Sequence, residues 1–303
     1  MQDQDHLIET LVTCHPELED AVSTWIETQT GIAPSVYGTP EDTHITISLY
    51  QEPDDPRKIV PSELDHFIQS LGDLGLNTDS TQISQSSIAK EDWAESWKAH
   101  FHPIKIGDRL VVRPSWEPAP ASPETIDIVI DPGLSFGTGH HQTTHYCLQK
   151  LVQLKDQGFS PANVLDAGTG SGILAIAAAK LGFPNIFAFD NDPESIRVAK
   201  DNATDNHVSF QVFLADCQSA ASNIPVSPAR FDLVAANILA ETLIRYASEL
   251  AALVAPGGIL LAAGILETQF ADVESAFQSQ GLTPVDNSTD TPWKSGSFMK
   301  PNS

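Results

Sequence analysis

From residue 161 onward, short apolar runs alternate with longer segments in which apolar residues recur every three or four positions. The short runs predict β-strands, and the periodic segments predict α-helices. The predicted strands cover 164–165, 186–189, 208–214, 231–235 and 259–261, and the predicted helices cover 173–181, 193–206, 240–253 and 267–280. Such alternation predicts an α/β fold with a doubly wound, mainly parallel sheet, whose ligands lie at the carboxyl ends of the strands. Runs at 282–286 and 293–299 predict a closing antiparallel hairpin.

The amino-terminal part has a different pattern, with helical periodicity at 16–28 and 61–71 and strand-like runs at 7–13, 44–50 and 83–88. This order predicts a small α+β domain of the ferredoxin-like kind. Next, Trp93, Trp97 and Phe101 line one face of a predicted helix over residues 91–101, as a helix face that packs on a core does. We therefore expect an amino-terminal α+β domain over residues 1–88, a connector with the aromatic helix and short strands over 89–130, and the doubly wound domain over 131–303.

The charge is strongly negative and unevenly distributed. The formal net charge is −24, from 40 acidic and 16 basic side chains. Residues 1–80 contain 16 of the acidic side chains but only Arg57 and Lys58 as basic ones. Nucleic acid is a poor match because phosphate binding needs clustered Lys and Arg. A basic partner suits this surface, and an acidic surface that serves only solubility is the alternative.

The remaining composition argues against disulfides, zinc and a membrane span. Cys14, Cys147 and Cys217 are far apart and form no C-x-x-C pair, so we expect a reducing cytoplasm. The amino terminus is acidic where a signal peptide would be basic. The longest apolar stretch, 250–266, contains Pro256-Gly257-Gly258, which predicts a helix, a turn and a buried strand instead of a membrane span.

A glycine-rich turn follows the first strand of the large domain. Its sequence over 164–172 is V-L-D-A-G-T-G-S-G, and an apolar helix follows directly. Gly168 and Gly170 let a ligand lie against bare backbone, and the next strand ends in Asp190, where a carboxylate can accept hydrogen bonds from two ribose hydroxyls. Position 173 is Ile173, so the spacing differs from the G-x-G-x-x-G motif of nicotinamide and flavin proteins. The turn predicts a different nucleoside cofactor.

Two further elements complete the candidate site. A second glycine-rich loop over 131–144 leads into a helix that Thr143 or Thr144 can cap, and the N–H groups there suit a carboxylate of the cofactor. Asn237 directly follows the strand 231–235; its carbonyl can accept a hydrogen bond from an amine and direct the amine's lone pair, although it can also serve as a helix cap. His140, His141 and His145 have no Cys or carboxylate at ligand spacing, so we expect no metal.

The glycine motif alone resembles those of class I S-adenosylmethionine-dependent methyltransferases, which have a Rossmann-like fold. Taken together, the motifs resemble the PrmA family, which methylates protein eleven of the large ribosomal subunit. The motifs, spread over residues 93–266, are W-x-x-x-W-K-x-x-F-H-P, D-P-G-L-S-F-G-T-G-H-H-Q-T-T, the glycine motif, D-N-D-P, A-N-I-L-A and P-G-G-I-L-L-A-A-G-I-L. Pro292-Trp293 near the carboxyl terminus also agrees.

The resemblance implies S-adenosyl-L-methionine as cofactor, with contacts from Thr144, Gly168, Gly170, Asp190 and Asn237. It also implies Asn237 as the catalytic residue, a role for Asp216 at the adenine, and repeated N-methylation of lysine ε-amines and an α-amine on a basic ribosomal protein. Two alternatives stay open. One is an N-methyltransferase for a base or small amine, although the Pro-Pro-aromatic sequence that such enzymes carry after the Asn is missing here. The other is a cofactor-binding assembly factor without catalysis.

Overall fold

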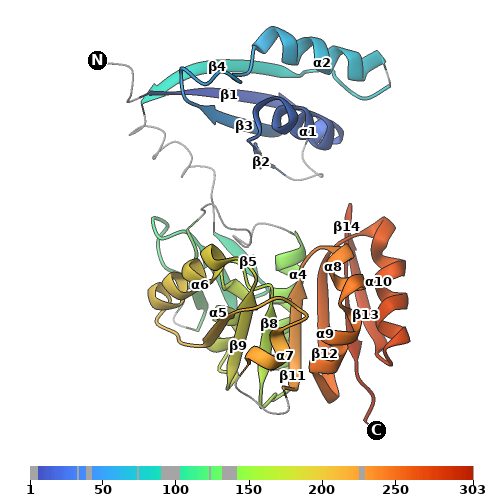
Figure 1. Ribbon diagram of the computed structural model, residues 1–303. Coiled ribbons are helices and arrows are strands. Elements are labelled where there is room, and N and C mark those ends of the chain that lie inside the picture. Colours follow the sequence, from blue (N-terminus) through green and yellow to red (C-terminus); the bar gives the residue numbers. More distant parts are fainter. Residues whose placement is uncertain are drawn as a thin grey trace. The chain divides into compact units, whose positions relative to one another are not determined.

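The computed structural model describes residues 6–32, 34–38, 43–73, 75–89, 103–122, 124–131, 142–224 and 229–302. Contacts divide the chain into two compact units, Met1–His100 and Phe101–Ser303 (Figure 1). The short strands that the sequence analysis placed in a connector belong to the second unit by their contacts. The aromatic helix predicted over 91–101 lies outside the described residues.

The amino-terminal unit is a four-stranded antiparallel sheet with two α-helices. Its elements are β1 (His6–Cys14), a 3-10 turn (Pro16–Leu18), α1 (Glu19–Thr30), β2 (Ser35–Tyr37), β3 (Ile45–Gln51), α2 (Pro61–Asp73) and β4 (Gln82–Ala89). The strand order β2-β3-β1-β4 and the sequence βαββαβ are those of a ferredoxin-like fold, as predicted. The strand β2 was not predicted, because three residues are too few to establish an alternation.

Both helices of this unit pack on one face of the sheet. Alternate strand residues such as Val12 and Ile47 join α1 and α2 in one buried cluster, and Trp25 of α1 stacks on Phe67 of α2. The helix α1 ends where Gly31 adopts a left-handed conformation, with φ of 73°. Among the described residues of this unit, α1 and α2 thus cover one face of the sheet.

The second unit contains a small sheet and a seven-stranded sheet. The small sheet consists of β5 (Ile104–Ile106), β6 (Leu110–Arg113) and β7 (Ile126–Val129). The large sheet has the order β10-β9-β8-β11-β12-β14-β13, and its first five strands are parallel. Its strands are β8 (Val164–Ala167), β9 (Ile186–Asp190), β10 (Gln211–Leu214), β11 (Phe231–Asn237), β12 (Val254–Leu266), β13 (Thr283–Asp290) and β14 (Trp293–Met299). The predicted doubly wound sheet and its closing hairpin are confirmed.

Helices cover both faces of the large sheet (Figure 1). They are α4 (Gln142–Asp156), α5 (Ile173–Lys180), α6 (Pro193–Asp205), α7 (Ala220–Asn223), α8 (Ala240–Arg245), α9 (Ala247–Leu253) and α10 (Glu267–Ser279). Strand residues alternate between two buried clusters: Leu233 and Ala235 face α4 and α5, whereas Val234 and Ala236 face α8, α9 and α10. The strand order reverses between β8 and β11, so this is the place where ligands bind in such sheets.

Two boundaries differ from the predictions because of tertiary contacts. The helix predicted over 240–253 is interrupted at Tyr246, which leaves α8 and α9. The strand predicted over 259–261 begins earlier, at Val254, and includes the predicted turn as an irregularity in its pairing with β11. Gly257 N–H donates to the Lys300 carbonyl, and Lys300 N–H donates to the Gly258 carbonyl, so the carboxyl-terminal segment holds this turn beside the sheet. Among the described helices, none has the length and apolar composition needed to cross a membrane.

Candidate active site

The glycine-rich turn joins β8 to α5 and depends on backbone conformations that favour glycine. Gly168, Gly170 and Gly172 have φ values of 73°, 51° and 83°. The N–H groups of Gly168 and Thr169 both donate to the Phe189 carbonyl, which ties the turn to the end of β9. A Cβ on Gly168 would lie 2.3 Å from Cγ2 of Ile238. The turn therefore packs directly against the residue that follows Asn237.

The buried side chain of Asp166 supports the glycine-rich turn through hydrogen bonds. Its side chain is 2% exposed, and Oδ2 accepts hydrogen bonds from Thr169 Oγ1 at 2.7 Å and from Ala175 N–H at 3.1 Å. Burial raises the pKa of Asp166 from 3.8 to about 6; these hydrogen bonds oppose the shift, and the charge of Asp190 adds to it. The sequence analysis included Asp166 in the motif but assigned it no role. An acidic residue within an apolar strand was the signal for this buried support.

Asp190 ends β9 beside the glycine turn. Its Oδ2 accepts the Gly170 N–H at 2.9 Å, and its Oδ1 accepts the Asp192 N–H at 3.0 Å. Because a carboxylate has about four lone-pair positions, two acceptor positions remain for other donors. Asp192 in turn caps α6, accepting the N–H groups of Glu194 and Ser195. The carboxylate of Asp190 is thus oriented by backbone on both sides and keeps the capacity that two ribose hydroxyls require.

Asn237 and Thr144, which are 93 residues apart, meet at the same edge of the sheet. Asn237 is the last residue of β11, and its Nδ2 donates to Thr144 Oγ1 at 3.1 Å. Thr144 is 1% exposed, on the first turn of α4. This hydrogen bond uses the amide nitrogen, so the amide oxygen of Asn237 is directed away from Thr144. That oxygen lies 3.2 Å from the position a Cβ on Gly264 would occupy.

Two local expectations for these residues are wrong. The described part of α4 begins at Gln142, so Thr143 and Thr144 lie within its first turn instead of capping it. The helix after Asn237 has Leu239 at its N-cap position, without a side-chain hydrogen bond, so Asn237 is not a helix cap. In both cases the side-chain partner comes from another element of the fold. The capping alternative for Asn237 is thereby removed.

The structure brings Thr144, Gly168, Gly170, Asp190 and Asn237 together around the strand-order reversal. Gly168 follows β8, Asn237 ends the neighbouring strand β11, and Ile238 packs against the position of Gly168. Asp216 follows β10, and its Oδ1 accepts the N–H and the hydroxyl of Ser219, both at 2.7 Å. Those hydrogen bonds lower its pKa. Asp216 therefore stabilises the turn over residues 216–219.

The second glycine-rich loop, including His140 and His141, lies outside the described residues from 132 to 141. His145 lies on α4, where its Nε2 is 3.1 Å from Gln149 Nε2. In the part of the chain that is described, no three His, Cys, Asp or Glu side chains come together as metal ligands. The three cysteines are free and buried.

Comparisons with known proteins give a consistent result. A family model for ribosomal protein L11 methyltransferase (PrmA) matches residues 9–300 of this chain. The ribosomal protein L11 methyltransferase of Geobacter metallireducens is 39% identical over 251 residues, which cover 82% of this chain and 79% of that protein. The protein of the same name from Citrifermentans bemidjiense is 46% identical over 217 residues, covering 71% of this chain and 69% of that protein.

One solved structure is also similar along its whole length. It is the ribosomal protein L11 methylase of Lactobacillus delbrueckii subsp. bulgaricus, which is 31% identical and superimposes with a TM-score of 0.59. The match covers 66% of this chain and 99% of that chain.

Proposed function

Because this chain belongs to the ribosomal protein L11 methyltransferase (PrmA) family, we propose that it transfers methyl groups from S-adenosylmethionine to lysine ε-amines, and to an α-amine, of ribosomal protein L11. Family membership confirms the resemblance predicted from the motifs and makes the chain a methyltransferase. The preference for lysine is the finer part of the proposal, and it is supported by the chemistry that Asn237 offers to an amine.

The contact between Asn237 and Thr144 is the observation that carries the proposal. Thr144 accepts the Nδ2 hydrogen bond at 3.1 Å, so the carbonyl end of the Asn237 amide is held in one direction. A carbonyl accepts a hydrogen bond from an amine N–H and leaves the nitrogen lone pair free to point elsewhere. Holding a nucleophile in line with its target accounts for a large part of such rate enhancements. Asn237 is therefore the residue that we assign to orienting the acceptor amine.

The surrounding residues fit a nucleoside cofactor with an amino-acid part. The backbone at Gly168 and Gly170 forms a cradle with positive φ, and Asp190 keeps acceptor positions for ribose hydroxyls beside it. We assign Thr144 to the amino-acid end of the cofactor, and its hydrogen bond with Asn237 supports this assignment. When bound there, S-adenosylmethionine supplies an electrophilic methyl group on its sulfonium. The chain's own contribution is to bind the ribose and to place the amine.

The acceptor must be a neutral amine because an ammonium has no lone pair. Asn237 cannot remove a proton, since its amide does not titrate in the physiological range. Burial of a lysine side chain disfavours its charged form and lowers its pKa. A buried edge such as the one around Thr144, which is 1% exposed, favours that loss of the proton before transfer.

We assign substrate recognition to the amino-terminal unit, over residues 1–88. This unit has its own buried core, in which α1 and α2 cover one face of the sheet. Its first 80 residues hold 16 acidic side chains against two basic ones. Opposite charge accelerates encounter and selects partners. A basic ribosomal protein is the partner that such a surface favours.

The test is methyl transfer to a defined substrate. Purified chain would be incubated with tritiated S-adenosylmethionine and recombinant unmethylated ribosomal protein L11, and the modified positions identified by mass spectrometry. We expect label on lysine ε-amines and on the amino-terminal α-amine. Label confined to other residue types would refute the lysine assignment, and the absence of label under conditions where the cofactor binds would refute the activity itself.

A further inference from the structure

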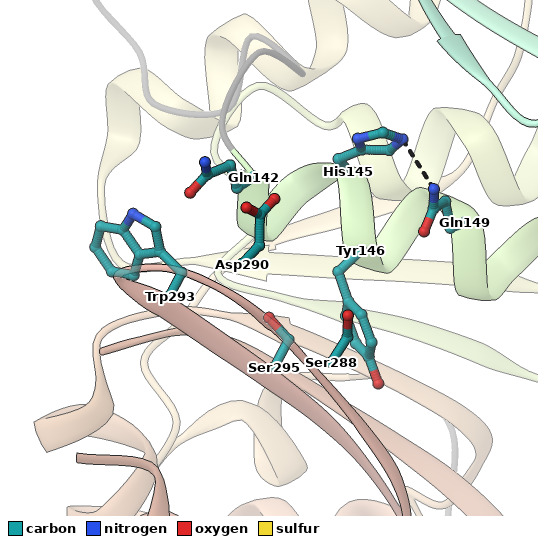
Figure 2. Close-up of a pocket in the computed structure, with 8 residues that line it drawn as sticks. All are labelled: Gln142, His145, Tyr146, Gln149, Ser288, Asp290, Trp293 and Ser295. Atoms are coloured by element: carbon teal, nitrogen blue, oxygen red, sulfur yellow. Dashed lines mark hydrogen bonds between the residues drawn. The ribbon is translucent and has the colours of Figure 1, made fainter. Parts of the chain in front are cut away.

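A small cavity opens beside the site, between the first turns of α4 and the turn end of the β13–β14 hairpin. Its volume is about 130 Å³. The side chains that line it, shown in Figure 2, are Gln142, His145, Tyr146, Gln149, Ser288, Asp290, Trp293 and Ser295. The residues from α4 are spaced as on one helix face, and those from the hairpin include the pair Asp290 and Trp293 at its turn.

The cavity lies at the same edge and on the same face of the sheet as Asn237. Asn237 pairs with Ala263 on β12, and the adjacent Ala262 pairs with Gly296 on β14. Neighbouring strands are about 4.8 Å apart, and β13, which carries Asp290, is three strands from β11, or about 14 Å across the sheet. Trp293, opposite Asp290, pairs with Leu266, three residues or about 10 Å beyond Ala263 along β12, so Asp290 lies about 17 Å from Asn237. Asn237 and Thr144 do not line the cavity. It is therefore a neighbour of the position where the amine is held.

The lining favours a positive charge. Asp290 is its carboxylate, and among the described residues that line the cavity there is no Lys or Arg. Burial lowers the pKa of His145, and the charge of Asp290 opposes this shift, so the imidazole is largely neutral at pH 7. The indole of Trp293 adds an aromatic ring, which attracts cations over its face.

Lys150 and Lys294, which adjoin lining residues in the sequence, are engaged elsewhere. Lys150 Nζ lies 2.6 Å from Oδ2 of Asp286. Lys294 Nζ lies over the ring of Phe270, 4.8 Å from its centroid, and Phe270 belongs to α10 on the opposite face of the sheet. Neither ammonium compensates the Asp290 charge within the cavity.

The size limits what can enter. An engineered apolar cavity of about 150 Å³ holds one benzene molecule, so a cavity of this volume accommodates one side chain and not a chain segment. We propose that the cavity is a second subsite for the protein substrate, which binds a Lys or Arg side chain close in sequence to the methylated amine. The separation of about 17 Å between Asp290 and Asn237 equals about five residues of extended chain. This inference rests on the proposed function, because it assumes a basic protein substrate.

The test compares two charge-neutralising variants. Asp290→Asn keeps the shape of the side chain and removes its charge, and Asp272→Asn removes the same charge from α10, outside the cavity. With unmethylated ribosomal protein L11 and saturating S-adenosylmethionine, we expect Asp290→Asn to raise KM about tenfold, because a charge-assisted hydrogen bond is lost. The value of kcat and the affinity for S-adenosylmethionine should stay within about twofold of the native protein. Asp272→Asn should behave like the native protein.

A third variant and a binding measurement keep this test separate from that of the proposed function. His145→Lys places a positive charge in the cavity and should raise KM at least as much as Asp290→Asn. Calorimetric affinity for ribosomal protein L11 needs no turnover and should fall in both cavity variants. An unchanged affinity and KM in both, or an equal effect of Asp272→Asn, would overturn the subsite. If the native protein did not methylate ribosomal protein L11 but the cavity variants still bound it more weakly, the proposed activity would be refuted and the subsite would stand.

Discussion

The antiparallel sheet of the amino-terminal unit and the seven-stranded sheet offer different surfaces to a ligand. The antiparallel sheet of the amino-terminal unit has α1 and α2 on one face, so its other face carries side chains such as Glu9, Tyr50 and Ser86. The large sheet is buried on both faces, and its functional residues therefore gather where its strands end. In the function proposed above, the first sheet recognises the protein substrate through a face, and the second binds the cofactor and the amine at an edge.

The carboxylates of these two sheets also differ in their surroundings. Glu9 lies mid-sheet, and its two oxygens accept hydrogen bonds from the hydroxyls of Tyr50 at 3.0 Å and Ser86 at 3.1 Å. Burial and the bond to Glu9 raise the pKa of Tyr50, so it stays a donor. Asp166 is instead sealed inside the large unit and bonded to the turn that it supports. The carboxylate on the sheet face thus links neighbouring strands, whereas the buried one stabilises a loop.

Removing the amino-terminal unit should have the largest effect, because it tests whether that unit recognises the protein substrate while the second unit binds the cofactor. A chain that begins at Ile88 retains Thr144, Gly168, Asp190 and Asn237, so it should bind S-adenosylmethionine with an affinity within about twofold of the full chain. Methylation of ribosomal protein L11 should fall by about a hundredfold or more, which corresponds to about 3 kcal/mol of lost binding. Calorimetry and the tritium assay measure the two quantities. Full-rate methylation by the shortened chain would reduce the acidic unit to a solubility feature.

Asn237→Ala should separate chemistry from cofactor binding at the edge. We expect kcat to fall about a hundredfold because the amine loses its orientation. Affinity for S-adenosylmethionine should change much less. Thr144→Ser keeps the hydroxyl that accepts the Asn237 hydrogen bond, so it should retain most of kcat. Equal losses of kcat and cofactor affinity in Asn237→Ala would make Asn237 a cofactor contact only.

Asp166→Asn tests the buried support through its pH dependence. The pKa of Asp166 rises from 3.8 when unfolded to about 6 when folded, so the folded state binds more protons between these values. Its contribution to stability therefore falls as the pH rises from about 4 to 6, by about 3 kcal/mol. Asn does not titrate and should lack this fall. Urea unfolding at pH 4 and pH 7, following the transition that S-adenosylmethionine shifts, measures it; parallel pH profiles for both proteins would contradict the assignment.

Asp190→Ala should weaken the binding of S-adenosylmethionine about tenfold or more, through loss of charge-assisted hydrogen bonds to ribose. Asp192→Ala is the matched control, because Asp192 caps α6 and its removal affects only the stability of that helix start. The control should bind the cofactor normally. Calorimetric affinities of the two variants decide the matter, and an unchanged affinity for Asp190→Ala would end its ribose assignment.

Salt should have the smallest effect, and only on the protein substrate. Raising the salt concentration from about 50 to 500 mM shortens the screening length to a few ångströms, so attraction between exposed opposite charges weakens. KM for ribosomal protein L11 should rise several-fold, while affinity for the cofactor changes little. Steady-state rates across this range provide the measurement. Equal salt dependence of both ligands would argue against capture by charge.

Local motifs in the sequence predicted the parts whose geometry is local. The glycine turn, the Asp190 that ends β9 and the alternation of strands and helices depend on neighbouring residues, and the structure has them where the pattern places them. Side-chain capping was predicted at Thr143 or Thr144 because only the adjacent residues were visible. The partner that Thr144 takes is 93 residues away. Local helix propensity carries no information about a hydrogen-bond partner so far away in the sequence.

The sequence by itself determined the class of fold, the glycine-rich turn and the strand-ending position of Asp190, because glycine conformations and strand ends depend on a few neighbouring positions. Only the tertiary structure decided that Asn237 meets Thr144, that Asp166 is sealed beneath the turn, and that Asp290 and Trp293 face α4 across a cavity. Those contacts depend on strand order and register. A shift of one residue in β11 would turn Asn237 to the opposite face of the sheet.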